Sequence, residues 1–372
     1  MQFLTLEISE LRNLRSVSVS LDPGLNYFFG ENGAGKTAVL EAVSLLARGR
    51  SFRTGQAADL ISFGADRLTL RADVLDEHRG RFRIGLSRNK AGKTEVRLNG
   101  EPGRRLSEIA RLLPVQVLLP SLSELVFGAP SQRREWLDWG LFHVKPGYLD
   151  GLRSYLQILR QRNAGLKSVA AGRLTRTELD VWTRNLATQG LLVHGWRSDY
   201  LRELAMEVNL VLGRLSPGLS IAFQYQGGWA EGESLEKVLS DSLPRDVKLG
   251  ATSAGPHRAD IEIRTGSTQG SRASAVLSRG QGKIVACAMV LGQAKLLGRL
   301  TNRSSVFLID DLGAELDHEH SRTLFEILGE MSSQVLATSA LAPETMRPTA
   351  VVPISMFHVE QGNVRRVGLR HD

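Results

Sequence analysis

The sequence has little cysteine and no long apolar run. Cys287 is the only cysteine among 372 residues, so no disulfide can form within the chain. Apolar stretches such as 115–119 and 306–309 are far shorter than the roughly 20 residues that a membrane-spanning helix needs. The first residues include an early acid, Glu7, and no basic stretch, so they do not resemble a secretory signal. We therefore expect no membrane partner and a cytoplasmic location.

Positive charge is the clearest bias in the composition. The net charge is +8, and arginine supplies 38 of the 47 basic residues. Arginine forms bidentate contacts with phosphate, so this excess favours a polyanionic partner, nucleic acid before a membrane surface. Residues 48–111 hold 15 Lys and Arg against 8 Asp and Glu, and residues 151–214 hold 10 against 5. Each stretch is a candidate DNA-facing surface or an ordinary solvated face.

Hydrophobic periodicity divides the chain into three parts. The first part predicts strands, with a helix after the glycine-rich turn near residue 30; the strands include 67–75, 80–87 and 94–98. The middle predicts two packed helices with a polar tip around 163–177. Strands and helices alternate again after residue 219. We therefore predict an α/β P-loop NTPase, with an ABC- or Rad50-like head formed by residues 1–115 and 250–372 and an inserted helical arm at 116–249.

One local motif predicts a phosphate-binding loop. It follows an apolar strand, opens an amphipathic helix and fits G-x-x-x-x-G-K-[ST] without a gap: Gly30, Glu31, Asn32, Gly33, Ala34, Gly35, Lys36 and Thr37. Glycines let successive N–H groups turn toward phosphate oxygens, and the helix points the positive end of its dipole at the same place. We expect Lys36 to bridge the terminal phosphates of ATP and the Thr37 hydroxyl to ligate Mg²⁺.

Two adjacent acids predict the second half of this site. Residues 306–309 are all apolar, as in a strand buried within a parallel sheet, and Asp310 and Asp311 follow them. We expect Asp310 to hold Mg²⁺, directly or through water. Asp311 is the candidate that orients or deprotonates the attacking water. For the acid pair alone, helix capping is the structural alternative.

A third motif lies directly before a predicted helix. Residues 277–281 read L-S-x-G-Q, which is the signature of ABC-type ATPases. In this class Ser278, Gly280 and Gln281 would contact the γ-phosphate of ATP on a partner subunit. Two chains would then close head to tail around two ATP molecules.

Three further positions complete the candidate site. Asp317 follows Asp311 by six residues. Thr338 occupies the switch position, from which a side chain can sense the γ-phosphate. Gln116 is a candidate for the Q-loop residue that links nucleotide to the inserted arm, or it is an ordinary polar residue in a strand.

These residues together resemble the RecF family of bacterial recombination-repair proteins. The similarity includes Leu11-Arg12-Asn13-Leu14 and the three motifs above. Two other elements are more specific: residues 128–138 resemble G-x-P-x-x-R-R-x-x-L-D, and residues 255–258 read G-P-H-R. Ala314 and Ala259 depart from the family pattern, which often has serine and a second acid there. The resemblance implies that Arg12 and Asn13 also contact the nucleotide.

The resemblance implies an activity and partners as well. It implies an ATP-dependent homodimer that binds double-stranded DNA and junctions of single- and double-stranded DNA. It implies slow DNA-dependent ATP hydrolysis and a role in DNA repair, recombination, replication and the SOS response. There the family helps to load RecA at single-stranded gaps, together with RecR and RecO.

Other ATPase classes differ from this chain in spacing. A transporter subunit would place the signature closer to the phosphate loop than the 242 residues that separate Ser278 from Lys36. A chromosome-organising or Rad50-type protein would insert a far longer arm, and a nuclease of the overcoming-lysogenisation type would carry an extra acid-rich metal-binding domain. An ATP-dependent SMC-like DNA scaffold, or an ABC ATPase subunit without a RecA-loading role, is the alternative.

Overall fold

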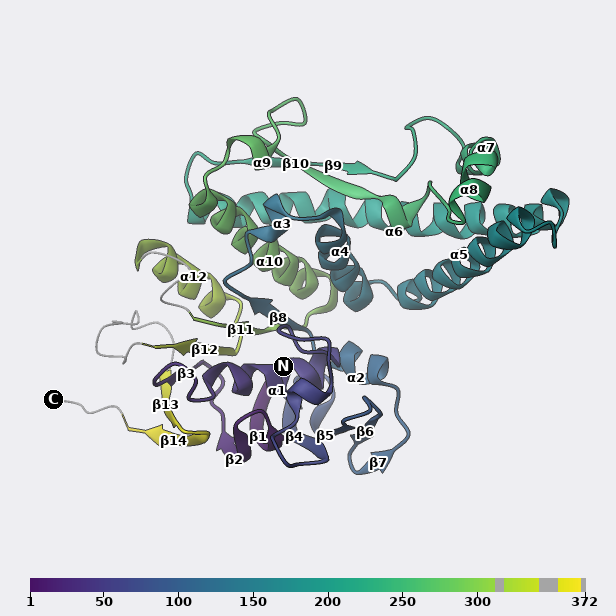
Figure 1. The fold of residues 1–372 in the computed structure, drawn as a ribbon. Helices are drawn as coiled ribbons and strands as arrows, with labels where there is room; N and C mark the ends of the chain where they lie inside the picture. The colour runs from purple at the N-terminus through teal and green to yellow at the C-terminus, as the bar shows by residue number, and fades with distance from the viewer. Residues whose placement is uncertain (312–317, 341–353, 369–372) are drawn as a thin grey trace. The chain divides into compact units, whose positions relative to one another are not determined.

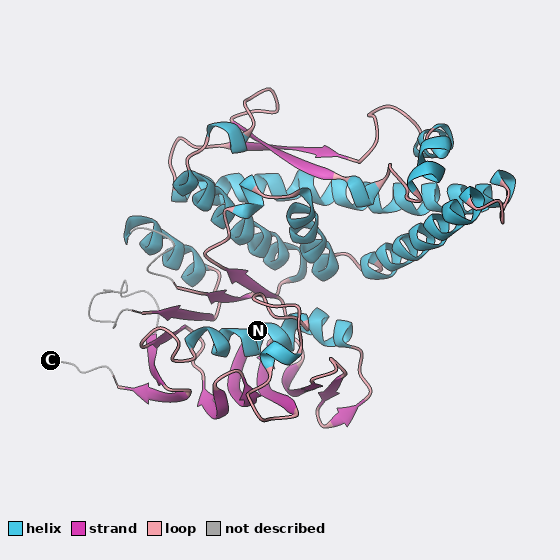
Figure 2. Cartoon of the chain, in the orientation of Figure 1, coloured by secondary structure: helices cyan, strands magenta, loops and turns pink. Residues whose placement is uncertain are grey.

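The computed structural model describes residues 1–311, 318–340 and 354–368. Two compact units are distinguished: the first comprises residues 1–122 and 297–372, and the second comprises residues 123–296. Figure 2 shows that sheets dominate the first unit and helices the second. These units differ from the predicted head and arm chiefly in residues 250–296, which pack within the second unit. The division into a head and an inserted arm stays a prediction.

A six-stranded antiparallel sheet forms one layer of the first unit (Figure 1). Its order is β2-β1-β4-β5-β6-β7, with bounds β1 Gln2–Leu11, β2 Leu14–Ser20, β4 Arg67–Asp76, β5 Gly80–Asn89, β6 Thr94–Leu98 and β7 Glu101–Pro102. Buried residues alternate with exposed ones along most of β4 and β5, so one face of the sheet lies in the core and the other faces solvent. The strands predicted between residues 67 and 98 are confirmed.

A second, mixed sheet combines strands from residues 25–118 with strands from residues 306–367. Its order is β14-β13-β3-β12-β11-β8, with bounds β3 Leu25–Phe29, β8 Val115–Leu118, β11 Val306–Ile309, β12 Val335–Ser339, β13 Ile354–Glu360 and β14 Asn363–Val367. All pairs are parallel except that of β13 with the edge strand β14. The loops after the parallel strands therefore leave from one edge of the sheet, where ligands of α/β proteins bind.

Helix α1 (Lys36–Arg48) is enclosed in the core of the first unit. Eleven of its 13 residues are buried, and it contacts strands of both sheets. A helix that is apolar on nearly all sides is stable only when it is surrounded. Its side chains, the inner face of the antiparallel sheet and parts of the mixed sheet form one apolar cluster. Each fully buried leucine in such a cluster contributes about 1.5–3 kcal/mol. The start of α1 is thereby fixed in place.

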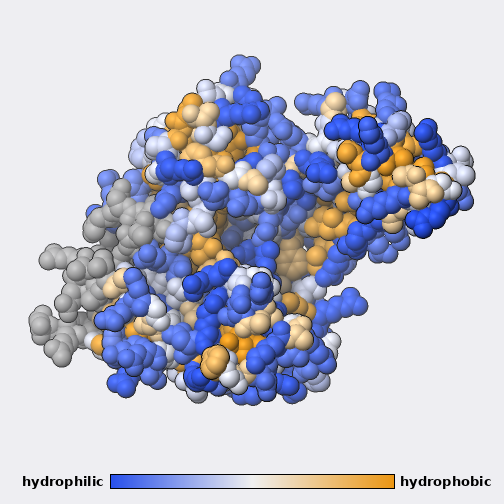
Figure 3. Space-filling model, in the orientation of Figure 1, coloured by the Kyte–Doolittle hydropathy of each residue, from blue (hydrophilic) through white to orange (hydrophobic). Residues whose placement is uncertain are grey.

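Three further helices are described in the first unit. They are the 3₁₀ turn η1 (Ala58–Leu60), α2 (Leu106–Leu112) and α12 (His318–Glu330). The second unit contains α3 (Glu124–Phe127), α4 (Pro130–Val144), α5 (Tyr148–Ala170), α6 (Arg176–Leu215), α7 (Leu235–Asp241), α8 (Leu243–Leu249), η2 (Pro256–Arg258), α9 (Ala273–Val276) and most of α10 (Arg279–Thr301), whose residues 297–301 belong to the first unit. An antiparallel strand pair, β9 (Ile221–Gln226) and β10 (Asp260–Thr265), accompanies them. Hydrophilic residues cover most of the visible surface of each unit, and apolar residues appear in smaller patches (Figure 3).

The two long helices predicted for the middle of the chain are α5 and α6, which pack against each other. The 40 residues of α6 span about 60 Å at 1.5 Å per residue. A capping box between Thr175 and Glu178 starts α6. The predicted polar tip at 163–177 was too long: α5 continues to Ala170, because Leu166 is fully buried on its inner face. The turn comprises only residues 171–175.

A buried ion pair holds α5 to the segment after α7. The guanidinium of Arg162 donates to Asp246 Oδ2 at 2.9 Å, and both side chains are fully buried. Arg162 also donates to Thr252 Oγ1 at 2.7 Å and to the Leu239 carbonyl at 3.2 Å. A buried charge is costly unless it is paired and hydrogen-bonded, and this network meets both conditions.

A second network explains the two family-specific elements of the sequence. Arg133 in α4 donates to both carboxylate oxygens of Asp260, at 2.8 and 3.1 Å. Asp138 accepts two bonds of 2.8 Å from Arg197 in α6, and Arg197 donates in turn to the Pro256 carbonyl at 2.8 Å. The G-x-P-x-x-R-R-x-x-L-D and G-P-H-R elements are therefore joined through charged hydrogen bonds inside one unit.

Among the described helices, α10 alone is long and apolar enough to cross a membrane by length and composition. In this structure 67% of its most apolar window is buried. The core helix of a soluble protein passes the same test, so α10 is weak support for membrane insertion.

Replacing Asp246 with alanine is expected to lower the free energy of unfolding by about 3–5 kcal/mol, because Arg162 would keep a buried charge without a partner. Urea unfolding measures this loss. The matched control is Asp241→Ala, since Asp241 pairs with Lys237 where both side chains are 65% exposed. That exposed pair should contribute little to stability, because water screens it. Equal losses in the two variants would contradict the role given to the buried pair.

Candidate functional site

The loop between β3 and α1 adopts backbone conformations that favour glycine. Gly30, Gly33 and Gly35 have φ angles of 150°, 83° and 119°. A Cβ on Gly30 would lie 2.1 Å from the Val359 carbonyl oxygen in β13. A Cβ on Gly35 would lie 2.8 Å from Leu14 Cδ2. The loop is therefore packed against its neighbours so closely that side chains at these two positions do not fit.

The ammonium of Lys36 lies inside this loop. It donates to the carbonyl oxygens of Gly30 at 2.7 Å and Glu31 at 2.8 Å. The side chain is largely buried, and burial lowers the pKa of Lys36, an effect that Asp311 and Asp310 partly oppose. A cation that follows a glycine-rich loop and begins a helix is suited to binding phosphate.

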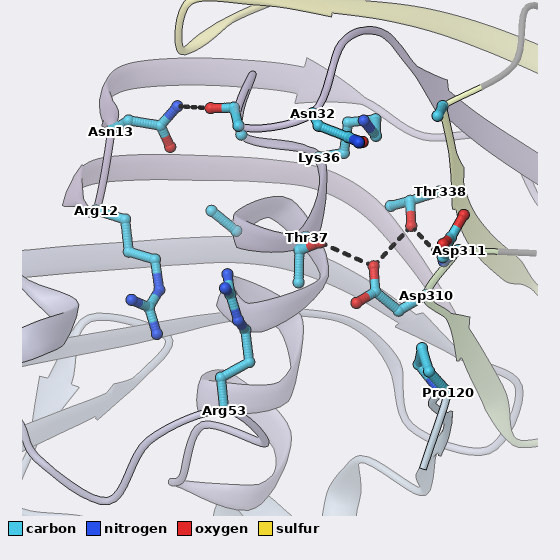
Figure 4. A pocket seen from close by; sticks show the side chains of 14 residues that line it. Arg12, Asn13, Asn32, Lys36, Thr37, Arg53, Pro120, Asp310, Asp311 and Thr338 are labelled. Carbon is cyan, nitrogen blue, oxygen red and sulfur yellow. Dashed lines mark hydrogen bonds between the residues drawn. The ribbon is translucent and has the colours of Figure 1, made fainter. Parts of the chain in front are cut away.

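Asp310 connects the loop to the acidic strand. Its Oδ1 accepts hydrogen bonds from Thr37 Oγ1 at 2.9 Å and from Thr338 Oγ1 at 2.7 Å (Figure 4). Thr338 Oγ1 in turn accepts from the backbone N–H of Asp311 at 2.9 Å. The three predicted elements, namely the phosphate loop, the acid pair and the switch position, therefore meet in one chain of hydrogen bonds.

The same oxygens are suited to a divalent cation. Among the described residues, no group of three or more His, Cys, Asp and Glu side chains could hold a metal ion. The Thr37 hydroxyl and the Asp310 carboxylate offer two hard oxygen ligands, already within hydrogen-bond distance of each other. Mg²⁺ is usually held by one or two such ligands together with waters and substrate phosphates, so the donor set fits it.

Arg12 and Asn13 approach the loop from the turn between β1 and β2. Asn13 Nδ2 donates to the carbonyl oxygens of Gly33 and Ala34, at 3.1 and 3.0 Å. Arg12 forms a bidentate pair with the fully buried Glu41 of α1, at 2.5 and 2.8 Å. This hydrogen bonding raises the pKa of Arg12. Asn13 therefore fixes the loop, and Arg12 holds the helix that follows it, in addition to any contact with a ligand.

A pocket of about 300 Å³ opens above these groups, at the lower end of the size range of ligand sites. It collects most of the predicted site residues: Arg12, Asn13, Asn32, Gly33, Gly35, Lys36, Thr37, Asp310, Asp311 and Thr338. Gly30, Glu31 and Ala34 contribute only loop backbone, whose carbonyl oxygens bind Lys36 and Asn13.

Sequence reasoning missed one charged member of this pocket. Arg53 lines it together with Arg12 (Figure 4). Within the described part of the chain, no hydrogen bond or ion pair engages its guanidinium, so the charge is available to an anion. Arg53 belongs to the basic stretch 48–111, which was the only signal for it, since no motif covers the loop after α1.

The structure does not bring Gln116 to the pocket. Gln116 is buried in β8 opposite Phe307, whereas Pro120, just beyond the end of the strand, lines the pocket. Two residues of extended chain, about 7 Å, separate Gln116 from the carboxyl end of its strand, where the pocket lies. Asp317 and Ala314 lie outside the described residues.

The signature residues belong to the second unit and begin α10. Gln281 N donates to Ser278 Oγ at 3.2 Å, and Ser278 N donates to Gln281 Oε1 at 3.0 Å. This reciprocal pair is a capping box at the first turn of the helix. Gly280 leaves the space above that turn open, because a Cβ there would meet only Ser278 Oγ at 3.9 Å.

Known proteins match this chain over nearly its whole length. The family described as RecF/RecN/SMC N terminal domain matches residues 3–365. The DNA replication and repair protein RecF of Shewanella loihica is 35% identical over 364 residues, which cover 98% of this chain and 99% of that protein. The RecF of Pseudomonas entomophila is 35% identical over 366 residues, with 98% of each chain covered. The chain belongs to the RecF family.

Solved structures share the fold. The recombination mediator protein RecF with ATP, in the RecFOR pathway, matches with a TM-score of 0.87 at 24% identity, over 98% of this chain and 97% of that one. An Smc head bound to the C-winged helix domain of ScpA matches with a TM-score of 0.60 at 17% identity, over 100% of this chain and 98% of that one. The predicted fold class, an α/β P-loop ATPase of the ABC type, is confirmed.

The close packing of the RecF-family phosphate loop predicts that replacing its glycines with alanine lowers the free energy of unfolding by unequal amounts. Gly33→Ala meets no atom within 4 Å, so only its positive φ is unfavourable, at a cost of about 1–2 kcal/mol. Gly30→Ala should cost clearly more, because the Val359 backbone must also move. Equilibrium unfolding of both variants measures the difference. An equal or smaller loss for Gly30→Ala would contradict the packing described for this loop.

Proposed function

We propose that this chain binds ATP with Mg²⁺ and uses it to switch DNA binding during replication and recombinational repair. One observation carries the proposal. The phosphate-loop threonine, both strand-end acids and the switch threonine form a continuous hydrogen-bonded chain on one wall of a pocket. Membership of a family whose named members are DNA replication and repair proteins supports the DNA role.

Each pocket residue has a role that follows from its chemistry. The Lys36 ammonium, now bonded to loop carbonyls, would turn to the β- and γ-phosphates. Arg53 would add a second positive charge. Thr37 and Asp310 would hold Mg²⁺, which supplies charge neutralisation for the phosphates when bound. Asp311, which is exposed to solvent, would accept a proton from an attacking water.

The signature motif supports a nucleotide-dependent homodimer. The positive end of the α10 dipole, with an open glycine position beside it, favours an anion. Ser278, Gly280 and Gln281 of one chain would therefore contact ATP held by its partner. Hydrolysis would be slow and DNA-dependent, and the residues 1–115 and 250–372 would act as a head with 116–249 as its arm.

We further propose the cellular setting that the RecF resemblance implies. The protein would act in the cytoplasm on double-stranded DNA and at junctions of single- and double-stranded DNA. RecR and RecO would be its partners in loading RecA at gaps.

Lys36→Met is expected to weaken ATP binding at least tenfold, because a charge-assisted hydrogen bond contributes about 1.5–3 kcal/mol. ATP-driven dimerisation should disappear with it. Calorimetric titration and sedimentation velocity measure the two effects. Lys93→Met is the matched control, since Lys93 belongs to a second Gly-Lys-Thr in the exposed turn after β5 and should change neither. A Lys36→Met protein that dimerises normally with ATP would exclude this nucleotide site.

Asp311→Asn is expected to slow ATP hydrolysis about 10²–10⁴-fold while leaving ATP affinity unchanged, because a general base contributes roughly that factor. Steady-state turnover with DNA present, combined with nucleotide titration, separates the two quantities. The control is Asp66→Asn, because the Asp66 side chain is 97% exposed and lies outside the pocket. Turnover in Asp311→Asn equal to that of Asp66→Asn would move the base to another residue.

A further inference from the structure

The outer face of the antiparallel sheet carries a cluster of arginines that the nucleotide site does not use. Five exposed arginines on β4, β5 and β6, here called the arginine face, point away from the core: Arg67, Arg71, Arg81, Arg83 and Arg97. A depression of about 390 Å³ lies among four of them, all but Arg81, with Thr69, Ser87 and Glu95 also in its lining. Three carboxylates share the face, namely Glu7, Asp73 and Glu95, so positive charge is in excess.

A glycine forms the floor of this depression. Strand register places Gly85 of β5 between Arg71 of β4 and Arg97 of β6. Neighbouring strands are about 4.8 Å apart, so the two arginines begin about 10 Å from each other with no side chain between them. The two guanidinium groups can therefore bind one anionic group, or two adjacent ones, over the partly exposed backbone of Gly85.

The charges on the face are held in different ways. Asp73 binds Arg83 at 2.7 Å and Arg81 at 2.8 Å, and these hydrogen bonds lower the pKa of Asp73 to about 2, which keeps the carboxylate ionised and both arginines in place. Arg71 contacts Glu7 at 3.6 Å. Within the described residues, no hydrogen bond or ion pair engages the side chains of Arg67 and Arg97. Fixed and available guanidinium groups thus occur side by side.

We propose that the arginine face binds the phosphate backbone of duplex DNA. This inference rests on the proposed DNA role and assigns a surface to it. The alternation of arginine with Ser and Thr supplies charge and hydroxyl donors, which is the usual chemistry of backbone contacts. The lining of the depression has no aromatic ring on which a base of single-stranded DNA could stack, so the backbone of a duplex is the better fit. It also lacks the aromatic anchors that are enriched at the centres of protein interfaces.

Gly85→Glu is the sharpest test, because it puts a carboxylate between Arg71 and Arg97. A Cβ on Gly85 would make only ordinary contacts, 3.7 Å from Arg97 Cβ and 3.9 Å from the Leu70 carbonyl oxygen, so the fold should accept the change. Gly85→Gln is its matched neutral control. We expect Gly85→Glu to weaken duplex binding about tenfold, with a smaller loss for Gly85→Gln.

A second variant tests the two arginines without ion pairs. Arg67→Glu with Arg97→Glu should weaken duplex binding further and reduce the slope of log affinity against log salt by about two, since each phosphate contact contributes about 0.9. Arg322→Glu with Arg365→Glu, two exposed arginines on α12 and β14, makes the same change of charge elsewhere. Its salt slope should stay close to that of the wild type.

Fluorescence anisotropy with labelled duplex and single-stranded DNA, at saturating ATP and across a salt series, measures these effects. ATP binding and circular dichroism should be unchanged in every variant. Wild-type protein that binds no duplex with ATP would overturn the proposed DNA role. Duplex affinity at the wild-type level in both the Gly85→Glu protein and the Arg67→Glu, Arg97→Glu protein would overturn the assignment of DNA to the arginine face and leave the proposed DNA role standing. If the variants lose affinity only for single-stranded DNA, the assignment of the arginine face to duplex DNA is overturned.

Discussion

The first unit is organised around the hydrogen bond between Thr37 and Asp310. It joins residues 273 positions apart in the chain, so both ends of the sequence must enter one sheet. Strand β12 lies between β3 and β11, and its last residues include Thr338, which bonds the same carboxylate. The strand order thereby turns three distant segments into one surface. The enclosed helix α1 then fixes the threonine, because nearly every side chain behind it is buried.

Buried charged pairs have the corresponding role in the second unit. Arg133, Arg162 and Arg197 are each buried, and each binds a carboxylate. Replacing such pairs with apolar residues is often neutral for stability, so their value is better sought in specificity of packing. The partners of Arg133 and Arg162, Asp260 and Asp246, lie on segments that follow α6, whereas Asp138, the partner of Arg197, lies on α4. Each pair therefore joins segments far apart in the sequence, and such pairing favours one arrangement of the helices over others with equal apolar burial. The G-x-P-x-x-R-R-x-x-L-D element is thus explained by hydrogen bonds within the chain.

The parts of the fold that could be predicted from the sequence are those in which the local residue pattern reflects the tertiary packing. The alternation in β4 and β5 and the motif at residues 30–37 both identify their structures, because burial of one face or close glycine packing leaves a local trace. Strands β13 and β14 were missed: in β13 three consecutive residues, 355–357, are buried, and this interrupts the alternation that identifies a strand. The Q-loop role of Gln116 stays a prediction: Gln116 does not line the pocket, and its distance from the strand end depends on where β8 stops, which the sequence does not show.

Arg53 and the arginine face show what sequence alone leaves open about charge. Both come from the same basic stretch, 48–111, yet Arg53 lines the nucleotide pocket whereas Arg71 and Arg97 lie on the outer sheet face. The composition gives only the total charge of this stretch. The strand register shows which of its arginines lie on the outer sheet face. Alternation along β4, β5 and β6 places every second residue on the solvent side, so arginines spaced by two or four residues accumulate on one face. The same antiparallel sheet can therefore support α1 and the phosphate loop with its apolar side while its other side holds a polyanion.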